Sequence, residues 1–106
     1  MHVNDKKILQ LRPETFALLV KQLRHFHDDA DLFEIDLDAM RVKGDLRVIQ
    51  NSFDKPLIGR TSSLDMAKRA AKATLAYVRI PHELELDDEF KTLVKNKGTR
   101  LLYIDE

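Results

Sequence analysis

The spacing of apolar residues changes several times along this chain, and each change predicts a different element. Over residues 13–27, apolar side chains recur every three or four positions, which places them on one face of a helix. This set comprises Phe16, Leu19, Val20, Leu23 and Phe26. Over residues 32–37 the period falls to two, the spacing of a half-buried strand. A weaker alternation over residues 6–11 predicts a short strand or an ordered arm.

Two turn signals predict hairpins in the middle of the chain. Gly44-Asp45 is a glycine-first pair typical of two-residue hairpin turns, and short apolar segments flank it at 40–43 and 46–50. A second candidate turn covers residues 54–56. We therefore expect three or four short strands between residues 32 and 60, with their pairing order left open.

Helix signals return in the second half of the chain. A long helix is expected over residues 62–79, because Ser62 and Asp65 have the spacing of a capping box and Pro81 follows. A third helix is expected to begin at Asp87 and to stop at Gly98, with acids at its start and lysines at its end, as the helix dipole favours. Residues 101–104 predict a closing strand.

These elements indicate an α+β fold. We expect a small antiparallel sheet of three to five strands, packed by two or three helices, in the order (β)-α-β-β-β-α-α-β. A length of 106 residues is close to the usual domain size, which favours a single domain over residues 1–106.

Composition narrows the classes of function. The 18 Lys and Arg residues balance 18 Asp and Glu residues, which disfavours non-specific coating of nucleic acid or anionic membranes. The chain has no cysteine, which excludes disulfides and thiolate metal sites and fits a reducing cytoplasm. The longest early apolar run, residues 16–20, is far shorter than the roughly 20 residues that span a bilayer. We expect a soluble cytoplasmic protein without membrane contacts.

The sequence has no nucleotide-binding glycine loop, serine-nucleophile motif or metallopeptidase motif. We therefore assign no catalytic residue, cofactor or metal ligand, and we favour a protein that is not an enzyme.

Basic residues gather on one stripe of the helix expected at 62–79. Lys68, Lys72 and Arg79 share this stripe and Arg69 lies at its margin. These four residues are candidate contacts to phosphate or to a partner. A solvated face of an amphipathic helix is the more common explanation of such a stripe.

Acidic residues line one face of the strand expected at 32–37 and continue just beyond it. Glu34, Asp36 and Asp38 are a candidate acidic partner face. Close carboxylates can also hold a divalent cation or act in acid–base chemistry, although the solvent face of an exposed sheet is the more common explanation.

The helix expected at 13–27 carries two histidines and an exposed leucine. His25 and His27 lie about 160° apart on a helix, which disfavours a shared metal and favours one partly buried and one exposed structural histidine. They could converge only if the helix ended near Arg24. Leu18 lies on the outer face and is a candidate for self-association.

The order of elements from residue 13 to residue 79 resembles the α-β-β-β-α layout of double-stranded-RNA-binding domains. The likeness centres on Ile58-Gly59, Ser62-Ser63 and the run Ala67-Lys68-Arg69-Ala70-Ala71. It implies phosphate contacts by Lys68, Arg69 and Lys72. Leu64 and Asp65 stand where that family has a lysine pair, and the same pattern is similar to AP2-type domains and HicB-type antitoxins, so we assign no family.

Charge is segregated along the chain. Residues 28–38 hold six acids and residues 83–89 hold five, without a base in either block, whereas residues 39–80 hold nine bases and three acids. Such blocks can pair within one fold, between subunits or across an interface, and the sequence leaves this open.

Our main hypothesis is a non-enzymatic binding or regulatory module that acts through protein–protein contacts, a homodimer included. The alternative is a nucleic-acid-binding protein that uses residues 60–79. A third reading is a small metal- or carboxylate-dependent enzyme.

Overall fold

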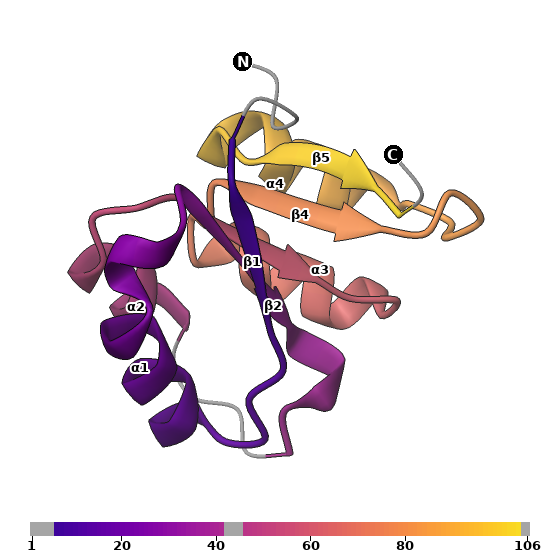
Figure 1. Cartoon of the computed structure of the whole chain (residues 1–106). Coiled ribbons are helices and arrows are strands. Elements are labelled where there is room, and N and C mark those ends of the chain that lie inside the picture. The colour runs from indigo at the N-terminus through magenta and orange to yellow at the C-terminus, as the bar shows by residue number, and fades with distance from the viewer. Residues whose placement is uncertain (1–5, 42–45, 105–106) are drawn as a thin grey trace.

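Strands and helices alternate strictly in the computed structural model, which describes residues 6–41 and 46–104. The elements are β1 (Ile8–Leu11), α1 (Phe16–His25), β2 (Leu32–Asp36), α2 (Leu46–Ser52), β3 (Leu57–Arg60), α3 (Leu64–Lys72), β4 (Tyr77–Ile80), α4 (Asp88–Lys97) and β5 (Arg100–Tyr103). Short 3-10 turns follow α1 (η2, His27–Asp29) and β2 (η3, Leu37–Ala39). Each α-helix therefore connects two strands (Figure 1).

The five strands form one parallel sheet in the order β1-β2-β3-β4-β5. The expected α+β fold with an antiparallel sheet is thus wrong, and the architecture is α/β. The physical reason is connectivity, since parallel neighbours require a crossover and each of the four helices supplies one. The hairpins that would have made an antiparallel sheet are not formed by the described residues.

The expected hairpins fail because residues 46–52 form helix α2 and not a strand. Leu46 and Ile49 are buried at a spacing of three, which suits a helix that faces the core. A short apolar run does not distinguish a buried helix from a strand. The predicted Gly44-Asp45 turn lies outside the described residues, and the described chain between residues 32 and 60 contains two strands, β2 and β3.

The helix expected at 62–79 is shorter than predicted. Its N-cap is Ser63, one residue later than expected, and the Ser63 side chain accepts a hydrogen bond from the Met66 amide. The helix ends at Lys72, and Thr74 has a left-handed φ of 61°. Residues 77–80 are strand β4, which separates α3 from α4 and breaks the predicted α-α succession.

Other predicted elements are confirmed. Residues 6–11 contain β1, residues 13–27 contain α1 and residues 32–37 contain β2. Asp87 caps α4 through a hydrogen bond from the Phe90 amide, and Gly98 ends that helix with a φ of 72°. Strand β5 closes the sheet as expected.

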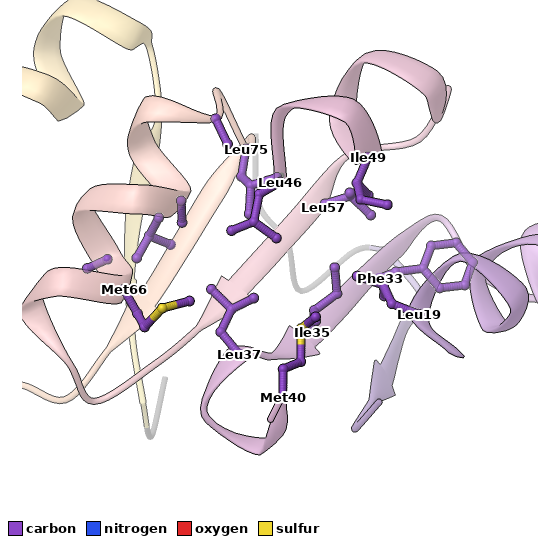
Figure 2. Close-up of a cluster of buried hydrophobic side chains, with 14 of the residues drawn as sticks. Leu19, Phe33, Ile35, Leu37, Met40, Leu46, Ile49, Leu57, Met66 and Leu75 are labelled. Atoms are coloured by element: carbon purple, nitrogen blue, oxygen red, sulfur yellow. The ribbon is translucent and has the colours of Figure 1, made fainter. Parts of the chain in front are cut away.

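The four α-helices of the described residues all pack on the same face of the sheet. Their buried residues belong to one cluster with alternate strand residues, among them Leu11, Phe33, Ile35, Leu57, Val78 and Ile80. Figure 2 shows Leu19 of α1, Leu46 and Ile49 of α2 and Met66 of α3 gathered around this face. The arrangement follows from right-handed crossovers between strands laid down in one direction.

The opposite side of the sheet, which we call the helix-free face, carries the other strand residues. Leu32, Ile58 and Tyr77 form a second, smaller buried cluster there, to which the helices contribute no residue. Farther along the strands, the same face carries Glu34 and Arg79.

Gly59 shows how closely the helical layer approaches the strands. A Cβ atom at this position would lie 3.0 Å from the Cδ1 atoms of both Leu37 and Leu75, and 3.4 Å from the Cβ of Ala70. Within the described ranges, no helix is long and apolar enough to cross a membrane.

Candidate functional site

Two large apolar side chains stand out as exposed in the described part of the chain. Leu18 on α1 is 38% exposed and Val48 on α2 is 53% exposed. Between these helices lies a hollow of about 180 Å³, which we call the α1–α2 groove. Its lining residues are Val20, Leu23, Arg24, Val48, Ile49, Ser52 and Phe53.

A second hollow, of about 400 Å³, adjoins the groove along the outer side of α1. Ala17, Leu18, Val20, Lys21 and Arg24 line it, so Val20 and Arg24 belong to both hollows. Lys21 and Arg24 are exposed, and neither forms an ion pair with another described residue. The surface therefore combines an apolar floor with a cationic rim, a chemistry suited to an acidic and partly apolar partner.

His27 contacts Phe53, one of the residues that line this groove. Its Nδ1 atom lies 2.8 Å from Oδ1 of Asp28, and its Nε2 atom lies 2.7 Å from Oδ1 of Asp54. The ring meets Phe53 edge-on, with 5.4 Å between centroids. The hydrogen bonds to Asp28 and then to Asp54 raise the pKa of His27, and the same contact lowers the pKa of Asp54.

The two histidines of the α1 region do not converge. His25 is the last residue of α1, and its ring packs edge-on against Phe26 at a centroid distance of 4.6 Å. His27 turns instead to its two carboxylates. Among the residues that the structure describes, no group of three or more His, Asp or Glu side chains could hold a metal ion.

A charged network occupies the helix-free face, with Glu34 at its centre. Glu34 is only 3% exposed, and its Oε1 atom lies 2.6 Å from Nε of Arg79. Its Oε2 atom accepts a hydrogen bond of 3.2 Å from Nε2 of Gln10, and Nη1 of Arg60 lies 3.9 Å from the same atom. The parallel register brings these groups together, since Gln10 pairs with Glu34 and Arg60 pairs with Arg79.

The predicted acidic face is not a row of free carboxylates. Glu34 is buried in the network, and Asp36 lies 3.3 Å from Nε of Arg12. Asp38 lies in η3, beyond the end of β2. Its carboxylate accepts hydrogen bonds from the Thr61 hydroxyl at 2.5 Å and from the Ser62 amide at 2.9 Å. The three acids therefore serve three separate structural contacts.

The carboxyl ends of β1, β2 and β3 border a hollow of about 480 Å³, which we call the carboxyl-end hollow. Its lining residues are Gln10, Arg12, Asp36, Asp38, Arg60, Thr61, Ser62 and Ile104. Ligands of open α/β sheets bind beside the carboxyl ends of the strands. Here the strand order never reverses, so there is no switch-point crevice, and the hollow opens beside the helix-free face.

The predicted basic stripe is dispersed. Lys68 is held by Asp87 at 2.6 Å and by Glu89 at 3.1 Å, and the first of these contacts makes the largest contribution to its raised pKa. Arg79 lies on β4 and not on α3, with its guanidinium against Glu34. Arg69 and Lys72 remain exposed on α3.

Lys68 also connects two of the charge blocks of the sequence. Asp87 and Glu89 belong to the acidic block 83–89, so this block meets the basic segment within the fold. Glu34 and Arg79 join the other acidic block to the same basic segment.

Sequence reasoning missed Arg12, Arg60 and Val48. The first two lie at the ends of strands, and the alternation of Gln10 with Leu9 and Leu11 was the available signal that a polar face continues along β1. Val48 was missed because its segment was assigned to a strand.

The chain matches no protein-family profile, and no curated protein or solved structure shows significant similarity to it. The layout of a double-stranded-RNA-binding domain is also absent from residues 13–79, whose strands pair in parallel.

Proposed function

We propose that this protein is a non-enzymatic binding module that recognises a partner protein through the α1–α2 groove. The observation that carries the proposal is that exposed Val48 lines the groove and exposed Leu18 lines the adjoining hollow, and that the two hollows share Val20 and the cation Arg24. The partner segment we propose is an acidic amphipathic helix, which lays apolar side chains into such a groove. The proposal places this binding in the cytoplasm, in keeping with a sequence that has no cysteine.

The charge of the rim favours a different protein over a second copy of this chain. A two-fold dimer through the groove would place the same patch on both sides, so both surfaces of the interface would carry Lys21 and Arg24. Like charges across an interface are unfavourable, whereas carboxylates of a partner would be attracted. Leu18, predicted as a self-association residue, becomes a contact to this partner.

The test uses a designed peptide as the probe. A fluorescein-labelled peptide with leucines at helical spacing and glutamates on its other face is titrated with the full chain, and anisotropy is recorded. We expect saturable binding that weakens with salt. A matched peptide with lysines in place of the glutamates should not bind.

Val48→Glu places a negative charge in the groove, the same sign as the glutamates of the peptide. It should reduce peptide binding at least tenfold, a loss of about 1.4 kcal/mol. The control is Thr92→Glu, which adds the same charge at an exposed position of α4. Equal effects of the two substitutions, or equal binding of both peptides, would refute the groove. Sedimentation that finds a dimer of the wild type and a monomer of Val48→Glu would replace the proposal by self-association.

The nucleic-acid alternative has weaker support. It relied on Lys68, Arg69, Lys72 and Arg79, and two of these cations, Lys68 and Arg79, are engaged by carboxylates of the same chain, while Arg69 and Lys72 stay exposed. The carboxylate-dependent enzyme relied on Glu34, Asp36 and Asp38, each of which has a separate structural partner.

A further inference from the structure

The guanidinium of Arg60 lines the carboxyl-end hollow, and its hydrogen-bond donors are not all taken up by neighbouring residues. Arg60 is 42% exposed, and its described ion pair is the long contact of 3.9 Å to Glu34. Glu34 itself is already satisfied by Arg79 at 2.6 Å and by Gln10. Arg60 therefore retains most of its five N–H donors for another acceptor.

The other charged residues that line the hollow have closer partners than Arg60 has. Two guanidiniums, those of Arg12 and Arg60, and two carboxylates, those of Asp36 and Asp38, line it. Asp36 lies 3.3 Å from Nε of Arg12, and Asp38 accepts hydrogen bonds from Thr61 and Ser62. Arg60 is therefore the lining cation without a close counter-ion among the described residues.

We propose that the carboxyl-end hollow binds the carboxylate group of a small organic acid, with Arg60 as the principal donor. An arginine fork matches a carboxylate with two parallel hydrogen bonds. The hollow measures about 480 Å³, within the usual range of small-molecule sites. Ile104 provides an apolar wall for the organic part of the ligand.

A single carboxylate suits this hollow better than a phosphate dianion. Asp36 and Asp38 also line it, and two additional negative charges would be repelled by these acids. A single negative charge is repelled less and can still pair with Arg60. The start of α3 does not take part, because the Ser62 amide bonds to Asp38 and the Ser63 amide bonds to the Thr61 hydroxyl.

The site is held in place by the sheet. Arg60 is the last residue of β3, whose backbone pairs with β2 on one side and β4 on the other. Buried Glu34 draws the guanidinium of Arg60 toward the face, and Gln10 fixes the orientation of Glu34. The sheet therefore fixes where the Arg60 side chain leaves the backbone, beside the hollow.

The experiment is a titration of the full chain with benzoate, followed by amide chemical shifts and calorimetry. Benzoate should bind saturably and move the amide signals of Arg60, Thr61 and Ser62. Benzamide has the same shape without the charge and should not bind. Tighter binding of inorganic phosphate than of benzoate would overturn the carboxylate assignment, and equal binding of benzamide would overturn the role of the arginine.

Variants separate this site from the groove. Arg60→Ala should weaken benzoate binding about tenfold or more, the loss of a charge-assisted hydrogen-bond pair. Arg60→Lys keeps the charge without the fork and should bind with intermediate affinity. Arg69→Ala, which removes an exposed arginine of α3, is the control and should bind as the wild type does.

Thermal unfolding of Arg60→Ala establishes that the variant is folded, and unchanged benzoate affinity in that folded variant would refute the site. Val48→Glu should leave benzoate binding intact. A failure of the proposed carboxylate site can therefore be distinguished from a failure of the proposed partner groove.

Discussion

Nε of Arg79 lies 2.6 Å from Oε1 of Glu34, although 45 residues separate them along the chain. The two side chains belong to β4 and β2 and reach across β3 on the helix-free face. Nη1 of Arg79 also donates to the carbonyl of Tyr103 at 3.2 Å, which ties β5 to the same pair. The side chain of Arg79 therefore links β4 to both β2 and β5, in addition to the backbone pairing of the sheet.

Removing one partner of this pair should be strongly destabilising. Glu34→Gln leaves the guanidinium of Arg79, only 12% exposed, without its counter-ion, and we expect a loss of about 3 kcal/mol in the free energy of unfolding. Replacing both residues by leucine should cost much less, because no buried charge is left behind. Urea unfolding of the three proteins measures the difference. An equal loss in the single and double variants would contradict this account.

Stability should depend on pH through His27. Its pKa is raised above the ordinary value of 6.5 by hydrogen bonds to Asp28 and Asp54, while nearby Lys55 opposes the shift. The histidine therefore stabilises the fold fully below pH 6.5 and loses this contribution as the pH rises through the raised folded value. Asp54 has a lowered pKa, so its contribution is present above 3.8 and is lost as the pH falls through the lower folded value.

We expect the melting temperature to fall between pH 6 and pH 9 in the wild type and to change less in His27→Gln. NMR titration of the imidazole gives the pKa directly. A His27 that titrates at or below 6.5 would contradict the bridging role.

Two glycines should tolerate alanine poorly for different reasons. Gly59→Ala introduces a Cβ at 3.0 Å from Leu37 and Leu75, an overpacking expected to cost about 1–3 kcal/mol. Gly98→Ala meets no atom within 4 Å, but its φ of 72° is unfavourable for alanine, and we expect about 1 kcal/mol. A shorter side chain at position 75 should partly restore the stability lost in Gly59→Ala and should not restore the stability lost in Gly98→Ala. Urea unfolding measures both effects.

Asp87 should stabilise α4 in two separable ways. It caps the helix by accepting from the Phe90 amide at 2.8 Å, and it pairs with Lys68 at 2.6 Å. Asp87→Asn keeps the cap and removes the charge, so it should lower the melting temperature less than Asp87→Ala. Because the contact with Lys68 lowers the pKa of Asp87, its stabilisation should be lost only as the pH falls below the ordinary value of 3.8. Equal melting temperatures of the two variants would exclude a role for the cap.

The sequence predicted local structure well where the signal lay within one element. The period of α1, the alternation of β2, and the Asp87 and Gly98 ends of α4 all come from residues that touch their own neighbours in the chain. The extent of α3 was overestimated because apolar residues continue from Ala71 through Leu75 into Val78, and those of the turn and of β4 pack into the same core.

Pairing direction was not accessible in the same way. Whether a strand runs parallel or antiparallel to its neighbour depends on the connection between them, and that connection was misjudged when residues 46–50 were assigned to a strand. Because of this error, the predicted elements lacked one crossover helix and included hairpins instead. The shared face of Gln10, Glu34 and Arg79 was not predicted either, because it depends on how their strands pair.

A strand order that follows the chain order also has a consequence for folding. Paired residues lie 24 positions apart between β1 and β2, as in Ile8 with Leu32, and 19 positions apart between β3 and β4, as in Ile58 with Tyr77. No pair of strands requires the two ends of the chain to come together. Each pair closes a loop of similar length, so the entropic cost of loop closure is nearly the same for every pair. The sheet can therefore grow outward from any pair of neighbouring strands, the pairs that contain the edge strands β1 and β5 included.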